Sequence, residues 1–300
     1  MPQRSMGSQI WRIAGPLVIQ YLISGFIGVC AGVYLLGGHF TELMAAASGS
    51  TSAEQATKLS AELSAKMVEE AMKYSTEITM VTALCTIPIM LWLFYRDVKK
   101  DRAVGIIRAK QAPLWQYAGI VVLGMVACIA LNNLMTLSNI AFLSETYQKV
   151  NNGFYSSKWI IQVLGLGLIA PIAEELIYRG LLYKRLKETS SRGMAMFYSA
   201  LIFGLYHGNI VQAIYGFVLG LAFAYLYEQY GSIKAPIIAH VIVNLTSVVL
   251  TNTGGYRWIF ATPLRMGIVT VICATIAAAV FMLIKKIDNG NIPEIKNQTV

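Results

Sequence analysis

The segment APIAEELIYRG, residues 170–180, places two adjacent carboxylates and an arginine inside a long apolar run. Charged groups at membrane depth are costly, so they predict a functional site with partners elsewhere in the chain. On a helix, Glu175 and Arg179 are four residues apart and can pair, whereas Glu174 points about 100° away. This spacing predicts that the arginine holds Glu175 and leaves Glu174 free for chemistry. The alternative is a helix end whose charges extend to water at the membrane surface.

Two further pairs of side chains, each four residues apart, fall in later apolar runs. Phe203 and His207 share one helix face in the fifth of these runs, and His240 and Asn244 share another in the seventh. Either pair alone is also explained by packing, because buried histidines are often hydrogen-bonded and asparagines often join membrane helices. The chain has only 3 histidines, and two of them lie in these pairs. The combination with Glu174 therefore favours one common site.

Two carboxylates, two imidazoles and a carboxamide in a dry cavity favour hydrolysis of an amide. A carboxylate paired with histidine can activate a water for attack on the carbonyl carbon, and later return the proton to the leaving amine. Imidazole and carboxamide N–H groups can stabilise the oxyanion that develops. Peptide hydrolysis within the membrane, at a site toward the cytoplasmic half or the midplane, is the predicted reaction.

Three alternatives remain open at this point. A zinc enzyme could use Glu174, His207 and His240 as three ligands, although the HExxH spacing of common zinc proteases is missing; we favour a metal-free mechanism without a cofactor. A non-enzymatic immunity or scaffold protein would use the polar groups only to hold its helices together. A transporter could use them as a proton relay, but paired broken helices in corresponding halves are not visible.

The helices that must position these residues follow from composition. Hydrophobic residues make up 56% of the chain and charged residues 13%, which excludes an ordinary soluble domain. Eight stretches are long and apolar enough to span a membrane, or nearly so: 16–37, 76–95, 114–137, 158–183, 195–209, 211–230, 236–252 and 263–284. The predicted fold is all-α, a polytopic membrane helix bundle. The first stretch lacks an A-x-A cleavage site and is expected to be a retained helix.

Basic residues predict the orientation of the bundle. They cluster before the first span, after the second and fourth, and near the seventh and the end of the eighth. By the positive-inside rule both termini are cytoplasmic, and the alternation holds through eight spans. The net charge of +9 is thus a topology signal. Membrane lipids and a protein or peptide substrate are the expected partners, and a nucleic acid is not.

The chain divides into three predicted parts. Residues 1–150 hold the first helices, with an outer loop at 38–75 in which Leu59, Leu63 and Met67 predict an amphipathic surface helix. An external docking site is the alternative for this loop. Residues 151–255 form the catalytic core, and 256–300 the last helix and a polar, disordered tail. The four cysteines lie far apart within apolar spans and are expected to be structural.

The three motifs EExxxR, FxxxH and HxxxN, in this order, resemble the signature of the CPBP (Abi, or CAAX protease) family of intramembrane proteases. This family includes the type II CAAX prenyl endopeptidases. The flanking segments APIAEELIYRGLLYKRL and GSIKAPIIAHVIVN resemble it too. The resemblance covers residues 158–250, about a third of the chain, and every motif position is filled.

The resemblance implies an eight-helix membrane protease whose site opens toward the cytoplasm. Carried onto this chain, Glu174 activates water and is supported by Glu175 and Arg179. His207 binds or orients the water, and His240 with Asn244 forms the oxyanion hole. Bacterial relatives resemble bacteriocin self-immunity proteins or process peptides. We therefore expect a multi-pass protein of a bacterial plasma membrane, with lipid-modified proteins among its candidate substrates.

Overall fold

A computed structural model describes residues 5–41, 44, 48, 53–105 and 111–287. The first half contains α1 (Met6–Gly38), α3 (Ala53–Lys73), α4 (Ser75–Ala103), η1 (Leu114–Gln116), α5 (Tyr117–Leu137), α6 (Ile140–Leu143) and α7 (Glu145–Phe154). The second contains α8 (Trp159–Gln162), η2 (Val163–Ile169), α9 (Ala170–Glu175), η3 (Leu176–Tyr183), α10 (Lys184–Leu186), α11 (Arg192–Tyr206), α12 (Ile210–Tyr230), α13 (Lys234–Asn252), α14 (Gly255–Ile259) and α15 (Pro263–Lys285). The expectation of an all-α helix bundle is confirmed.

Seven helices in the described part of the chain are long and apolar enough to cross a membrane. They are α1, α4, η1 with α5, the continuous run from α8 to α10, α12, α13 and α15. The remaining predicted span, 195–209, corresponds to α11, which has 15 residues. At 1.5 Å per residue it is about 22 Å long, shorter than the hydrocarbon core. The eight predicted stretches thus correspond to seven spanning helices and one shorter helix.

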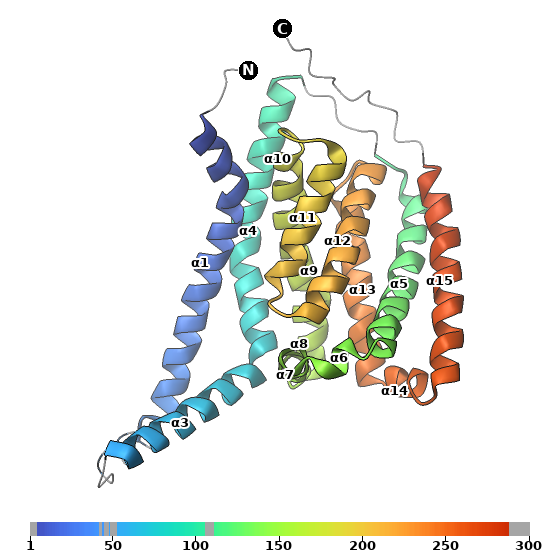
Figure 1. Cartoon of the computed structure of the whole chain (residues 1–300). Coiled ribbons are helices and arrows are strands. Elements are labelled where there is room, and N and C mark those ends of the chain that lie inside the picture. Colours follow the sequence, from blue (N-terminus) through green and yellow to red (C-terminus); the bar gives the residue numbers. More distant parts are fainter. Residues whose placement is uncertain (1–4, 42–43, 45–47, 49–52, 106–110, 288–300) are drawn as a thin grey trace.

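The helices alternate in direction through the bundle. The start of α1, the end of α15 and the short α10 lie at one end, and α3, α6, α7 and α14 lie at the other (Figure 1). Successive long helices therefore run in opposite directions, as the sequence predicts. The predicted tail from Asp288 to Val300 lies outside the described residues.

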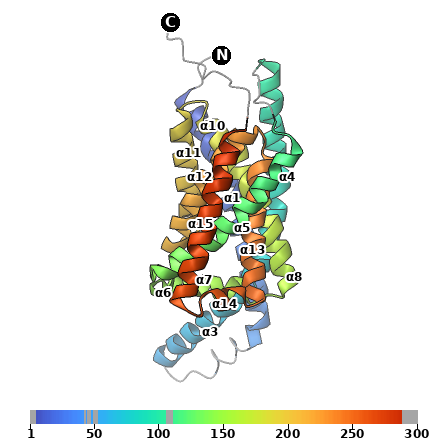
Figure 2. The ribbon, with the colours of Figure 1, turned by 90° about the vertical axis from the view of Figure 1, so that its right-hand side faces the viewer.

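The run from α8 to α10 is the centre of the bundle. Half of its most apolar window is buried, against 11% for α1 and for α15, which lie at the two edges (Figure 1). One apolar cluster joins η3 to α4 and α11, with Tyr178 and Phe203 among its members. A second joins α5, α12 and α13, with α15 packed on its outer side (Figure 2). Both clusters therefore converge around the helix that carries the two glutamates.

The outer loop contains the predicted surface helix. It is α3, which projects from the end of the bundle (Figure 1) and contacts α1, α4 and α7. Leu63 is the buried residue of the predicted stripe, while Leu59 is exposed. Cys30 and Cys85 are exposed, Cys128 and Cys273 are buried, and all four are free. The predicted helix is therefore present, and the structural role of the cysteines stays a prediction.

Candidate functional site

The two glutamates lie on α9, a short α-helical turn between two π-helical segments. In η2 the wider turn is seen directly, because the N–H of Ala170 bonds to the carbonyl of Gly165, five residues back. π-Helical turns are rare and occur frequently at functional sites. Glu175 is fully buried, and the side chain of Glu174 is 22% exposed. The two carboxylates therefore meet different surroundings, as their spacing predicts.

Arg179 and Glu175 form the ion pair expected from the sequence. The Nη1 of Arg179 donates to Oε1 of Glu175 at 2.8 Å, and neither side chain has any exposed surface. Nη2 of Arg179 donates to the carbonyl of Gly220 on α12 at 3.0 Å. The guanidinium also lies over the rings of Phe203, at 4.5 Å, and Phe223, at 5.3 Å. Because the arginine neutralises Glu175, the pair can remain buried where a single charge could not.

His240 connects the two glutamates. Its Nδ1 lies 2.8 Å from Oε1 of Glu175, and its Nε2 lies 3.6 Å from Oε2 of Glu174, too far for a hydrogen bond. A carboxylate can only accept, so Nδ1 carries the proton and Nε2 presents its lone pair when the ring is neutral. The imidazole also stacks on Phe223, with ring centroids 4.8 Å apart. Glu175 thus pairs with Arg179 and also orients the ring of His240. The contact between Glu175 and His240 was not predicted from the sequence.

His207 lies at the end of α11 and is not inside a spanning helix, which corrects the sequence-based placement. The helix ends at Tyr206 because Gly208 takes a left-handed conformation (φ 73°) and Asn209 caps α12. Nδ1 of His207 donates to the carbonyl of Phe203 at 2.9 Å, which leaves the Nε2 lone pair unused by that bond. The ring of Phe203 contacts His207 and His240, with centroids 5.0 and 5.7 Å away. The second motif thus joins the other two through Phe203.

Asn244 lies one turn after His240, and its amide Nδ2 donates to the carbonyl of Leu166 at 2.9 Å. Leu166 belongs to η2, so this bond ties α13 to the π-helical segment before the glutamates. An amide nitrogen has two N–H groups, and one remains after this bond. Asn244 therefore has a structural contact and a spare donor.

Two residues of the site were missed by reading the motifs alone. Phe223 and Gly220, both on α12, provide the stacking surface for His240 and the carbonyl for Arg179. A side chain at Gly220 would approach Ala200 at 3.0 Å and the guanidinium at 3.1 Å. The available signal was the small residue between apolar ones in FVLGLAFAY, residues 217–225.

The residues present fit a metal only in part. Both histidines use Nδ1 for a carboxylate or a backbone carbonyl, as metal-ligating histidines do. Within the described residues, however, there is no group of three or more His, Cys, Asp and Glu side chains that could hold a metal ion. The arrangement therefore supplies correctly oriented imidazoles without bringing a three-ligand set together.

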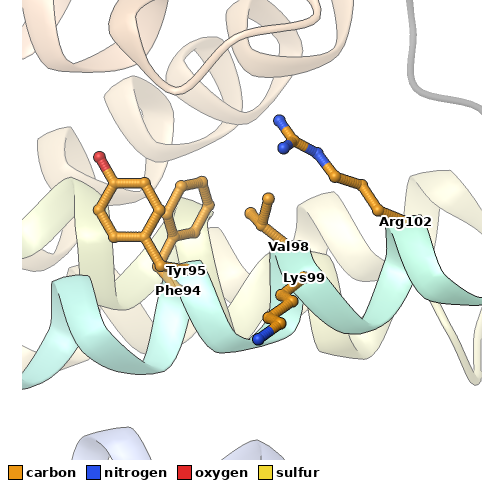
Figure 3. A pocket seen from close by; sticks show the side chains of 5 residues that line it. All are labelled: Phe94, Tyr95, Val98, Lys99 and Arg102. Carbon is orange, nitrogen blue, oxygen red and sulfur yellow. The ribbon is translucent and has the colours of Figure 1, made fainter.

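A hollow of about 480 Å³ lies on α4. It is lined by Phe94, Tyr95, Val98, Lys99 and Arg102 (Figure 3). None of the six predicted site residues lines it, so the candidate site rests on the buried contacts around α9.

The segment that carries these contacts can be compared with known proteins. Residues 156–246 match the family model "Type II CAAX prenyl endopeptidase Rce1-like". The matched segment contains all three motifs, and it confirms the resemblance that they predict. This segment of the chain is thus similar to a family of membrane endopeptidases.

One curated relative also matches the chain. It is named "Putative membrane peptidase YdiL", from Bacillus subtilis (strain 168), and is 29% identical over 90 residues. The match covers 30% of this chain and 37% of the relative, so the chain spans little more than a third of that protein. No solved structure matches the chain significantly.

Proposed function

We propose that the protein is an intramembrane endopeptidase that hydrolyses peptide bonds with a water activated by Glu174. The observation that carries the proposal is the buried chain of contacts from Arg179 through Glu175 to His240, with Glu174 beside it. This chain lies inside the segment that matches the endopeptidase family model. Protein or peptide substrates follow from that family, with lipid-modified ones among the candidates.

The proposed roles follow from the charges of the site. Arg179 neutralises Glu175, so Glu174 is the carboxylate left to take a proton from water. Glu175 fixes the ring of His240, whose Nε2 faces Glu174. His207 orients the same water with its Nε2, and the spare N–H of Asn244 faces the developing oxyanion. Glu174 then returns its proton to the leaving amine.

The proposed location is a bacterial plasma membrane, with the site open toward the cytoplasm. The basic residues in the last turn of α4, those of α10 and the one in the last turn of α15 belong to the end of the bundle where α1 begins (Figure 1). Positive residues favour the cytoplasmic side. An orientation test with accessible cysteines near the end of α15 would check this placement.

Comparison of protein N-termini in cells tests the function. A bacterial host that lacks the protein would express the wild type, Glu174→Gln or Glu145→Gln. Glu145 is an exposed glutamate on α7 and serves as the matched control. We expect new N-termini with the wild type and the control, and their loss with Glu174→Gln. Identical N-termini in wild-type and Glu174→Gln cells would refute the peptidase and favour a scaffold or immunity role.

A zinc-dependent peptidase is the second candidate, because both imidazoles are oriented as metal ligands are. Zinc, when bound, would activate the water, with Glu174, His207 and His240 as its ligands. Metal analysis of the purified protein, with cleavage measured before and after chelation, separates the two mechanisms. The glutamate mechanism predicts cleavage that a chelator leaves unchanged, whereas stoichiometric zinc with chelator-sensitive cleavage would overturn it.

A further inference from the structure

Tyr178 is a buried tyrosine whose hydroxyl has no hydrogen-bond partner in the part of the chain that the structure describes. The side chain has no exposed surface. Leaving a buried polar group unpaired costs roughly 1–3 kcal/mol, and one explanation for such a group in a native protein is a catalytic role. The hydroxyl is therefore a candidate to gain its partner only during the reaction.

The fold places Tyr178 about one helical turn after the proposed base. Tyr178 follows Glu174 by four residues, and helical side chains lean back over the preceding turn, which here carries Glu174. The two side chains interact electrostatically. The ring is fixed edge-on against Phe203, at 5.0 Å, and Tyr206, at 6.0 Å. Phe203 also contacts both histidines, so one aromatic ring connects Tyr178 with His207 and His240.

The reaction also needs a donor that the other residues do not fully supply. The Nδ1–H of His240 is engaged by Glu175, and a neutral imidazole has no second N–H. Asn244 has given one N–H to Leu166 and keeps one. Among the described residues, the O–H of Tyr178 is an unengaged donor about one helical turn from Glu174, in buried surroundings where a hydrogen bond to a developing charge is strong.

We propose that Tyr178 is a further catalytic residue whose hydroxyl donates a hydrogen bond to the oxyanion formed from the scissile carbonyl. The inference rests on the proposed peptidase function. The water oxygen bonds to the carbonyl carbon as Glu174 takes one of its protons, and the carbonyl π pair moves onto oxygen. Collapse of this intermediate breaks the C–N bond, and the amine leaves with the proton from Glu174. Tyr178 keeps its own proton throughout.

Tyr178→Phe tests the proposal, because it removes the hydroxyl and keeps the ring. With a peptide that the wild type cleaves, we expect kcat to fall about 10²- to 10³-fold, as for loss of one oxyanion donor. KM should stay within about threefold, since the bond forms only in the transition state. The melting temperature should be unchanged or higher, because an unpaired buried group is removed. Tyr183→Phe is the matched control, since Tyr183 is buried on the same element but packs against Tyr227.

A phosphinate analogue of the cleaved peptide bond supplies a second readout. It imitates the tetrahedral intermediate, so its affinity should fall with kcat in Tyr178→Phe, while the affinity for the product peptide is unchanged. A Tyr178→Phe variant with the kcat of the wild type would overturn the inference. A Tyr178→Phe variant that is less stable but binds the phosphinate as tightly as the wild type would also overturn it, because the hydroxyl would then have only a structural role. The proposed function is refuted by a different result, namely that the wild type and Glu174→Gln show the same cleavage or none.

Discussion

Replacing Arg179 by methionine should destabilise the protein strongly. Methionine has similar length and flexibility, so the change removes charge and hydrogen bonds more than volume. Glu175 would be left as a fully buried carboxylate without its ion-pair partner. Breaking a buried pair in this way costs about 3–5 kcal/mol. At roughly 2–4 °C per kcal/mol for chains of a few hundred residues, the melting temperature should fall by about 6–20 °C.

The double variant Glu175→Gln/Arg179→Met tests the physical reason. Glutamine keeps an acceptor oxygen for His240 and removes the unpaired charge. We expect most of the stability to return, to within about 1–2 kcal/mol of the wild type. The remaining loss reflects the bond to Gly220 and the contacts with Phe203 and Phe223. Cleavage should stay impaired, because a neutral amide orients the imidazole less well than a carboxylate does.

Thermal unfolding of the purified protein in detergent measures both effects. Lys58→Met is the control, because Lys58 and Glu54 have the same four-residue spacing but are 76% and 83% exposed. Loss of that exposed pair should change stability by less than about 0.5 kcal/mol. If the melting temperature fell equally in Arg179→Met and Lys58→Met, the buried ion pair would not be the cause of the loss. A double variant no more stable than Arg179→Met would likewise refute the unpaired charge of Glu175 as the cause.

Two further predictions concern packing around the site. Gly204→Ala should cost about 1–3 kcal/mol or more, because its Cβ would lie 2.5 Å from a backbone carbonyl of α12; Gly25→Ala, which meets open space, should be neutral in the same unfolding assay. Gln20→Leu removes two bonds between helices, one donated to the hydroxyl of Tyr206 and one accepted from the hydroxyl of Thr86, and at roughly 0.6–1.7 kcal/mol each the loss should be about 1–3 kcal/mol. Thr275→Val, whose hydroxyl bonds only within its own helix, is its control, and equal losses in both would contradict this role of Gln20.

Much of the fold follows from patterns that act locally. The apolar runs predict the long helices because a membrane helix must satisfy its backbone internally. The pairing of Glu175 with Arg179 is likewise predictable, since both lie on one helix at a fixed spacing. The break between α11 and α12 falls at Gly208 and Asn209, two residue types that commonly end and cap helices.

The contacts between helices could not be predicted in the same way. Sequence spacing does not show which carboxylate faces His240, because that depends on the rotation of α13 against α9. Glu175 takes the Nδ1 proton and Glu174 only faces Nε2, which gives the imidazole a defined orientation. The bond from Asn244 to Leu166 depends on the π-helical backbone of η2. Gly165, Gly167 and Pro171 indicate an irregular helix here, but residue types do not specify π-helical turns.

The π-helical segment η2 makes the direction of both glutamates depend on residue number as well as residue type. Each residue of an α-helix turns the chain by about 100°. A π-helical turn takes more residues and so rotates each residue by less, and the same seven residues in regular α geometry would therefore rotate the glutamates relative to α8. Glu175 would then leave the imidazole of His240, and the carbonyl that Asn244 binds would be lost. Converting η2 to a regular α-helix at unchanged length would thus disable the site while every one of its side chains is retained, whereas deleting one residue at the same time would largely restore their direction.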